Sequence, residues 1–407
     1  MQNTLTVIAR IKPGDAGRLE ELLDLIGQDI RGKDRNIYLK LEDFETLHFC
    51  RWVMIPNDGN GGQKEFLLFV SYYDGGLRAH LDEFVDRAGE AMDLIWGGCV
   101  GYPLTRTANP ERFKRDFYRF IFRHSYDFEA RHIGYHNERV VNVRRYINMR
   151  EKLQSFLDLR QVEKFLAEDL KSIVDLLPIK PRALADRLRP ITSFVAGLLR
   201  FIVFLLDFVW NLLFVFIIRP IRRTVQRREP RLNLQLNWQT IQPGIDDIED
   251  LVTQNQLTVI SRIKPGIREW FRVRFALLLI NMIAKHFQTK GSLGGIPTIH
   301  FAHWSIIDRG RWLLFISNYD GSWDSYIGDF SDKAAPGLDL VWRSAPDYPA
   351  KGAIDLEPFK KVIRLNQVKT QAFYSAYPNS TVINILNDRA LTRALDRDSV
   401  QAWLRRL

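Results

Sequence analysis

The chain has 407 residues and 46% hydrophobic content, which is enough for two or three domains with substantial cores. Its formal net charge of +10 indicates an anionic partner, either a membrane surface or nucleic acid. The two cysteines, Cys50 and Cys99, lack metal-ligand spacing, so we expect reduced, buried thiols, with one disulfide as the alternative. The first residues enter a strand pattern directly, and we therefore expect no secretory signal peptide.

A long internal repeat divides the chain. Residues Asn3–Gly14 return as Asn255–Gly266, and only two of these twelve positions differ. The likeness continues in residues 47–52 against 299–304 and in residues 67–75 against 313–321. We therefore expect copy one over residues 1–158, a linker over 159–254 and copy two over 255–407.

The elements of each copy can be predicted in chain order. In copy one, apolar alternation from Leu5 to Ile11 predicts a strand that stops at Pro13-Gly14. Helical spacing of Leu19, Leu22, Leu23 and Ile26 follows, and then residues 46–55 and 66–73 indicate a hairpin. A second helix is expected from about His80 to Ile95, matched by Tyr326 to Val341 in copy two.

The order strand, helix, strand, strand, helix is most of a ferredoxin-like unit. We expect an α+β protein in which tandem duplicated ferredoxin-like units form an α/β barrel, with an inserted apolar helical segment that associates with a membrane. This pattern resembles the dimeric α/β-barrel superfamily, with both halves fused in one polypeptide. Beyond each unit, extensions share Tyr135-His136-Asn137 and Tyr377-Pro378-Asn379, and we expect them to brace the barrel.

The linker contains an apolar run, Ile191–Ile218, with two charged residues, Arg200 and Asp207. Its length allows one transmembrane helix, which needs about 20 apolar residues. However, Asp207 at the bilayer centre would cost roughly 2.5–3.5 kcal/mol, and both flanks are basic. A single span would also separate the two copies, so we expect monotopic attachment at the cytoplasmic face, with a span or a buried soluble helix as alternatives.

The membrane-binding residues expected from this pattern are apolar side chains of the run and arginines of its flanks. They are Arg189, Phe201, Phe204, Trp210, Phe214, Arg219, Arg222 and Arg223. The first helix of copy two, with Trp270, Phe271 and Phe275, is also apolar and is expected to face lipid, the linker or the copy-two extension. Nucleic acid is disfavoured as a partner, because zinc-finger spacing and RNP-type motifs are missing.

Polar residues retained in both copies are the candidate site residues. Alternation places His48, Cys50 and Trp52 on one face of a strand, and His300 with Trp304 on the same face in copy two. If this face lines the interior, two imidazoles approach a shared cavity, where histidine can ligate haem iron or act as a general base. The alternative is a structural histidine that was duplicated with the unit.

The turns Tyr73-Asp74-Gly75 and Tyr319-Asp320-Gly321 end equivalent strands. Ser71–Gly75 is similar, in its last two residues, to the Gly-x-x-Asp-Gly motif of dye-decolourising peroxidases, with Ser71 in place of the leading glycine. This resemblance implies a haem cofactor and a role for Asp74 on its distal side, although the family's proximal histidine on a helix is not evident. Ordinary turn and capping chemistry is the alternative.

Two functions remain open from the sequence. The first is a membrane-surface enzyme that acts on an apolar or lipid-like substrate, in peroxidase-like or oxygenase-like chemistry. Its expected catalytic residues are His300, Asp320, Tyr319, Arg262, His48 and Asp74, with His48 and His300 also holding the cofactor and no separate metal site. The second is a non-catalytic, membrane-anchored lipid-binding or scaffold protein. Nucleotide-dependent, α/β-hydrolase and zinc-protease motifs are missing.

Overall fold

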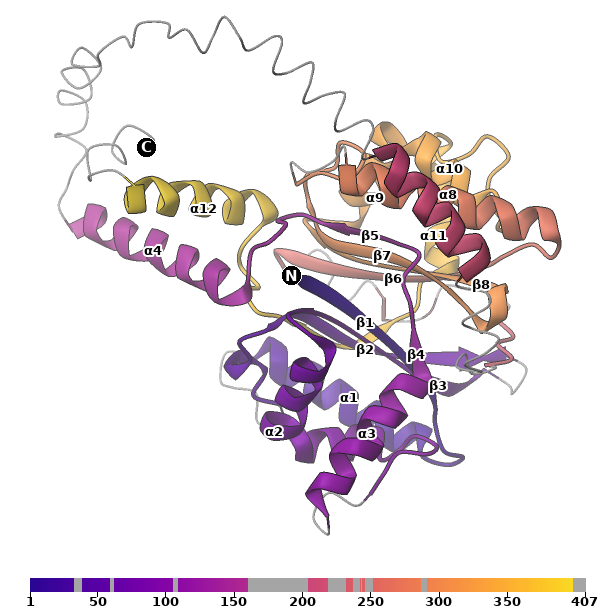
Figure 1. Cartoon of the computed structure of the whole chain (residues 1–407), viewed down its shortest axis with the longest axis horizontal. Helices are drawn as coiled ribbons and strands as arrows, with labels where there is room; N and C mark the ends of the chain where they lie inside the picture. The colour runs from indigo at the N-terminus through magenta and orange to yellow at the C-terminus, as the bar shows by residue number, and fades with distance from the viewer. Residues whose placement is uncertain are drawn as a thin grey trace, which may run out of the picture. The chain divides into compact units, whose positions relative to one another are not determined.

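The computed structural model describes residues 1–32, 39–58, 62–104, 109–159, 204–218, 232–236, 242, 244–245, 252–286 and 291–397. They form an α+β protein with two antiparallel sheets (Figure 1). Both sheets belong to one compact unit, Met1–Val141 with Pro220–Val382, and the rest of the chain forms a second unit. The expected lipid contacts at Arg189, Phe201, Arg219, Arg222 and Arg223 lie outside the described residues.

The first sheet contains the predicted strand and hairpin of copy one. In spatial order its strands are β4 (Ser125–Tyr126), β1 (Gln2–Arg10), β3 (Gln63–Asp74), β2 (Leu47–Asn57) and β9 (Thr370–Ser375). Alternating and β-branched apolar residues give β1, β2 and β3 two buried faces, one toward helices and one toward the other sheet.

The second sheet repeats this arrangement with copy two. Its strands, in spatial order, are β5 (Ala130–Ile133), β7 (Ile299–Ile307), β8 (Trp312–Asp320) and β6 (Gln254–Arg262). The register is the same in both copies: Gln2 lies opposite Asp74 across β1 and β3, and Gln254 lies opposite Asp320 across β6 and β8. The repeat in the sequence is therefore a repeat in the backbone.

Each sheet is completed by a strand from the other copy. Strand β5 belongs to the copy-one extension but pairs with β7, where Ala130 lies opposite Trp304. Strand β9 belongs to the copy-two extension but pairs with β2, where Ala372 lies opposite Trp52. Because of this exchange, neither copy can form its full sheet without the other.

The described strands form two sheets and no closed barrel, so the finer expectation of a closed barrel is not met. The interruption occurs at the corners where the chain changes sheets. Strand β4 has two residues and pairs only with β1, before β5 joins the other sheet. At the opposite corner, Gln367 forms an isolated bridge to Val259 on β6 before β9 joins β2.

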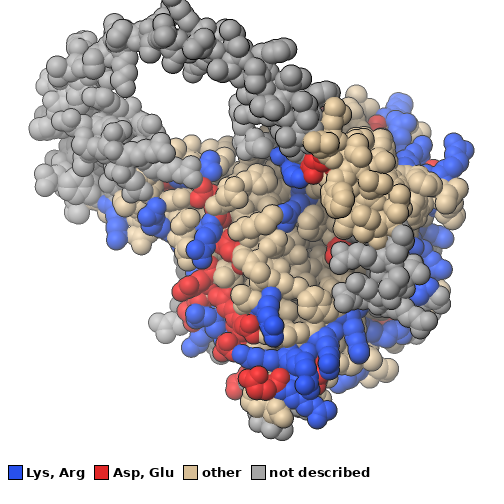
Figure 2. Space-filling model, in the orientation of Figure 1, with Lys and Arg blue, Asp and Glu red and all other residues tan. Residues whose placement is uncertain are grey.

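Three helices cover the outer face of the first sheet: α1 (Ala16–Arg31), α2 (Leu77–Trp96) and α3 (Pro110–His124) (Figure 1). The 3₁₀ turn η1 (Leu41–Asp43) precedes β2. On the surface over α3, Lys and Arg lie beside Asp and Glu (Figure 2), and Lys114 pairs with Asp86 at 2.9 Å.

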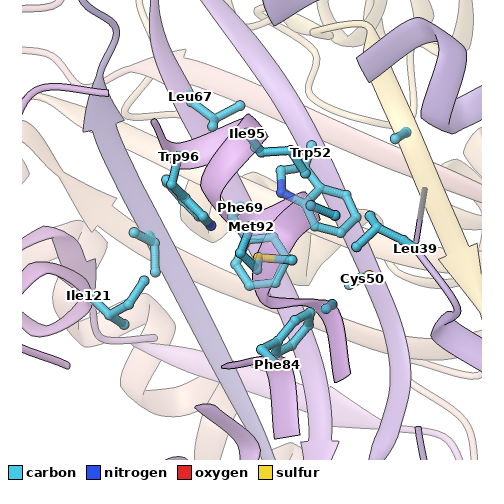
Figure 3. Close-up of a cluster of buried hydrophobic side chains, with 14 of the residues drawn as sticks. Leu39, Cys50, Trp52, Leu67, Phe69, Phe84, Met92, Ile95, Trp96 and Ile121 are labelled. Carbon is cyan, nitrogen blue, oxygen red and sulfur yellow. The ribbon is translucent and has the colours of Figure 1, made fainter. Parts of the chain in front are cut away.

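The core beneath these helices is aromatic (Figure 3). Trp52 on β2 and Phe69 on β3 have ring centroids 4.9 Å apart, and Phe69 meets Trp96 of α2 edge to face. Cys50 and Cys99 are buried and unbridged, as predicted. This core explains why large apolar residues are retained at equivalent positions of the two copies.

The second sheet is covered by α8 (Ile267–His286), α9 (Trp323–Lys333), α10 (Ala335–Trp342) and α11 (Leu356–Asn366). The helix predicted from Tyr326 to Val341 is thus two helices, separated at Ala334, where φ is −126° and Pro336 follows. The equivalent Ala88 inside α2 has φ −131°. The kink is a shared feature of the unit.

The remaining helices belong mainly to the second unit. They are α4 (Val140–Leu159), α12 (Val382–Arg397), a helix over residues 204–213 and the π-helix η3 (Phe214–Ile218). Arg150 of α4 pairs with Asp388 of α12 at 3.1 Å. Within the described ranges, none of the helices is both long enough and apolar enough to span a bilayer.

Candidate functional site

The predicted face of β2 is wrong at His48. The pairing of β2 with β3 shifts register between Leu47 and Phe49, and such a bulge breaks the alternation of side chains. Cys50 and Trp52 pack in the helix-side core, whereas His48 lies in the layer between the sheets, 5.2 Å from the ring of Phe301. The same shift occurs in β7 between Ile299 and Phe301.

Between the sheets, six side chains form one chain of hydrogen bonds, which we call the inter-repeat network. In order they are Asp74, His48, Tyr377, Tyr135, His300 and Asp320. The imidazole of His48 contacts Tyr377 through Nδ1 (2.7 Å) and Asp74 through Nε2 (3.2 Å). His300 contacts Tyr135 (3.1 Å) and Asp320 (2.7 Å) in the same way, and the two tyrosine hydroxyls are 2.6 Å apart.

Each tyrosine of the network bonds the histidine of the other copy. Tyr135 follows β5 and reaches His300, and Tyr377 follows β9 and reaches His48. The exchange of the two strands therefore brings the halves of the network together.

The two carboxylates also begin the helices of the extensions. Asp74 Oδ2 accepts a hydrogen bond from the backbone N–H of Val140, the first residue of α4, at 2.8 Å. Asp320 accepts the equivalent bond from Val382, the first residue of α12, at 2.8 Å. Each aspartate thus orients an imidazole and satisfies an unpaired N–H at a helix N-terminus. The aspartates do not cap the helices that follow their own turns, where the N-cap residues are Gly76 and Ser322; they bind the first residues of α4 and α12 instead.

Proton counting gives the network an unusual requirement. Five hydrogen bonds link its six side chains, and each bond needs one proton. Two tyrosine hydroxyls and two neutral imidazoles supply four protons. All five bonds can form at the same time only when one more proton is present on an imidazole or a carboxyl group.

The network is shielded from solvent. His48 and His300 are both 0% exposed, and Tyr135 is 1% exposed. Burial, together with the neighbouring Tyr377, raises the pKa of Tyr135 well above its ordinary value. Both nitrogens of each imidazole are already hydrogen-bonded, so neither histidine offers a lone pair to iron. The residues present do not fit a haem ligand set.

A second pair of buried residues lies between the sheets at equivalent positions, Arg51 and His303. The guanidinium of Arg51 donates to the carbonyl oxygens of Leu257 (2.8 Å) and Ser317 (2.8 Å) in copy two. Burial lowers the pKa of Arg51 to about 10, so this arginine stays charged at neutral pH.

His303 makes the reciprocal contacts in copy one, to Thr6 Oγ1 (3.0 Å) and the Tyr72 hydroxyl (2.7 Å). Burial, and then the charge of Arg51, lower its pKa to about 3, so it is neutral at physiological pH. Together Arg51 and His303 fasten each sheet to the other.

Tyr319, which the sequence suggested as catalytic, lies apart from the network. Its ring stacks on Tyr326 at 3.8 Å on the helix side of the sheet, as Tyr73 stacks on His80 in copy one. Burial lowers the pKa of His80 to about 3. These pairs pack helices onto the sheets, which is a structural role.

Other retained polar residues also hold repeated contacts. Lys12 Nζ donates to the carbonyl oxygen of Gly97 at 2.6 Å, and Lys264 Nζ donates to that of Arg343 at 2.9 Å. Both carbonyls follow the last residue of a helix, where cations are favourable. These folding contacts are therefore sufficient to explain why the two lysines are retained in both copies.

Arg262 lies elsewhere, at the end of β6, beside a cavity of about 910 Å³. The cavity is lined by Arg262, Lys264, Trp270, Arg309, Arg311 and Trp312, among others, and by no residue of the network. From the sequence, Arg262 was expected to be catalytic, Lys264 was noted as a retained polar residue, and Trp270 was placed in an apolar helix. The missed signal was a charge difference between the copies, since Arg311 stands where copy one has Glu65.

Among the residues that the structure describes, no group of three His, Cys, Asp or Glu side chains is placed to hold a metal ion. Comparison of the chain with protein-family models, with curated proteins and with solved structures found no match.

Proposed function

We propose that this chain is a non-catalytic, lipid-binding protein of the cytoplasmic membrane surface. In this proposal two ferredoxin-like units form a barrel-like platform, and the apolar run Ile191–Ile218 with its basic flanks attaches the platform to anionic lipid. The observation that carries it is the exposure of large apolar side chains in the described part of that run.

In the described part of the run, apolar residues face solvent. Leu206 is 67% exposed, Trp210 60% and Val209 55%. Burying such a side chain contributes about 1.5–3 kcal/mol, so several of them favour transfer to an apolar phase. Tryptophan is also favoured at the membrane–water interface.

The flanks of the run supply charge complementarity to anionic lipid. In the sequence, Arg187 and Arg189 precede it, and Arg219, Arg222 and Arg223 follow it. Each basic residue near an anionic leaflet contributes about 1 kcal/mol. Basic residues on both sides favour a segment that returns to the side from which it entered.

The strand exchange supports monotopic attachment over a span. Strand β5 precedes the apolar run in the chain and β6 follows it, yet both belong to the same sheet. A single transmembrane helix would place these two strands on opposite sides of the bilayer. A segment that lies in the interface, or re-enters, keeps them on one side.

The redox enzyme expected from the sequence is the second candidate. Each network imidazole is bonded to a carboxylate, as in sites where a histidine acts as general base. Its substrate would have to reach groups that are buried and fully hydrogen-bonded. Loss of turnover of an apolar substrate in Asp320→Asn, with the fold retained, would support this candidate.

The experiment that tests attachment is flotation of the full chain with vesicles. Vesicles of phosphatidylcholine alone are compared with vesicles that also contain phosphatidylserine. In the double variant Leu206→Asp/Trp210→Asp, the loss of two apolar contacts removes about 3–6 kcal/mol, so we expect at least about 100-fold weaker binding.

The matched control is Ile354→Asp, because Ile354 is also 72% exposed but lies outside the run. We expect this control to float like the parent protein. If the double variant floats as well as the parent, or if the control is released equally, attachment by the apolar run is wrong.

A further inference from the structure

The cavity at the end of β6 gathers positive charge. Arg262 ends β6, Lys264 follows it, and Arg309 and Arg311 come from the turn between β7 and β8. All four side chains are exposed. Among the described residues of the lining, one is acidic, Asp58, so the described cations outnumber the described carboxylates.

Arg262, Arg309 and Arg311 make no ion pair with any residue that the structure describes. On the surface over α3, by contrast, basic residues lie beside acidic ones (Figure 2). Neighbouring like charges repel each other, and an anion bound among them relieves that repulsion.

The two copies show that folding does not require this charge. In copy one, Arg10 pairs with Glu65 at 2.7 Å. The equivalence of Glu65 and Arg311 is visible in the backbone, because Ile11 donates to the Glu65 carbonyl and Ile263 to the Arg311 carbonyl, both at 2.8 Å. Where copy one has the ion pair of Arg10 and Glu65, copy two has two cations, Arg262 and Arg311, on the same backbone arrangement.

The turn that carries Arg309 is joined to residues 232–234 by hydrogen bonds. The carboxylate of Asp308 accepts hydrogen bonds from the backbone N–H groups of Leu232 (3.0 Å), Asn233 (3.2 Å) and Leu234 (3.2 Å). Asp308 and Arg309 have φ of 46° and 57°, a left-handed conformation that non-glycine residues rarely adopt. Residues 232–236 also follow the apolar run and its basic flank in the chain.

An apolar stripe begins beside the cavity. Trp270 of α8 lines the cavity, and at four-residue spacing Ile267 (72% exposed), Phe271 (49%) and Phe275 (41%) form an exposed face of the same helix. A single ligand with an anionic head and an apolar tail matches both features.

We propose that this cavity binds the phosphate group of an amphiphilic ligand, and that the α8 stripe contacts its apolar part. Guanidinium groups suit this role because they bind phosphate oxygens in pairs of charge-assisted hydrogen bonds. The phosphate belongs either to a phospholipid headgroup or to a soluble phosphate ester, and the stripe favours the phospholipid. The inference rests on the proposed membrane-surface function and gives it a specific ligand class.

The test is titration calorimetry of the full chain with three soluble probes: dihexanoyl phosphatidic acid below its micelle concentration, glycerol phosphate and inorganic phosphate. The variant Arg311→Glu restores the acidic residue found in copy one. We expect saturable binding of dihexanoyl phosphatidic acid to the parent protein and about tenfold or greater weakening in Arg311→Glu. Arg309→Ala, which adds no negative charge, should weaken binding in the same direction.

The matched control is Arg112→Glu, since the side chain of Arg112 is 64% exposed and its substitution makes the same charge change. This control should bind the probe like the parent protein. Equal affinity in Arg311→Glu and the parent, or equal weakening in Arg112→Glu, would overturn the proposal.

The probes distinguish the source of the phosphate. Binding of dihexanoyl phosphatidic acid without comparable binding of glycerol phosphate supports a lipid headgroup, and comparable binding of both supports a soluble ester. The result is also separable from the attachment proposal. A variant with a defective cavity should still float with vesicles through the apolar run. A variant with a defective apolar run should still bind the soluble probes.

Discussion

Removal of the Tyr377 hydroxyl tests the inter-repeat network directly. In Tyr377→Phe the ring can keep its packing against Phe49, but His48 Nδ1 loses its 2.7 Å partner and the Tyr135 hydroxyl loses a 2.6 Å partner. A buried polar group left unsatisfied costs about 1–3 kcal/mol, and Tyr135 keeps its bond to His300. We therefore expect Tyr377→Phe to lower the free energy of unfolding by roughly 2–4 kcal/mol.

The assay is urea unfolding in mild detergent, arranged as a double-mutant cycle with Tyr135→Phe. Because the two hydroxyls share a bond, the double variant should lose less stability than the sum of the single variants, by about 1 kcal/mol. Tyr374→Phe is the matched control: Tyr374 is also buried on β9, but its hydroxyl donates to the Leu41 carbonyl, at 2.8 Å, and not to a residue of the network.

When Tyr374→Phe is combined with Tyr135→Phe, the two losses of unfolding free energy should add within about 0.5 kcal/mol. If the losses of unfolding free energy in Tyr135→Phe and Tyr377→Phe add within the same limit, the two hydroxyls do not act as one network, and the reasoning from their geometry is refuted.

Two further predictions concern acid and backbone packing. Burial lowers the pKa values of His80, His132 and His303 to about 3, so below about pH 6.5 the unfolded chain binds protons that the folded chain does not. The free energy of unfolding should therefore fall as pH drops from about 6.5 toward 3, by up to about 1.4 kcal/mol per pH unit for each histidine. In His132→Phe the urea midpoint should depend less steeply on pH. Midpoints that do not change between pH 7 and 5 would contradict this prediction. In Gly134→Ala the new Cβ would lie 2.5 Å from the Ile299 carbonyl oxygen, so we expect the free energy of unfolding to fall by about 1–3 kcal/mol. In Gly328→Ala, within α9, the new Cβ meets no atom within 4 Å, so the free energy of unfolding should rise by up to about 1 kcal/mol. Thermal unfolding measures both changes.

The local elements of the fold were predictable because their signals are local. Alternation from Leu5 to Ile11, the stop at Pro13-Gly14 and the glycine-rich hairpin loop all depend on neighbouring residues. The exchange of β5 and β9 was not predictable in this way. Strand β5 has four residues, and its place is decided by the edge of β7, a strand that begins more than 160 residues later in the chain.

The candidate site was predicted in part. His48, His300, Asp74 and Asp320 were selected as repeated polar residues, and the structure joins them in one network. The sequence did not reveal that Tyr135 and Tyr377 cross between the copies, because this depends on the strand exchange. The bulge at His48 was equally hidden, since β-bulges leave no periodic signal. Catalysis by these residues stays a prediction.

In a duplicated chain, agreement and difference between the copies carry different information. Residues retained in both, such as Asp74 and Asp320, make the same structural bonds twice, so folding alone accounts for them. A difference on the same framework has no such explanation. Glu65 and Arg311 occupy equivalent backbone positions. Glu65 pairs with Arg10, whereas Arg311 pairs with no acidic side chain that the structure describes. Because like charges repel each other, the anionic ligand that we propose for this cavity would account for their place in copy two.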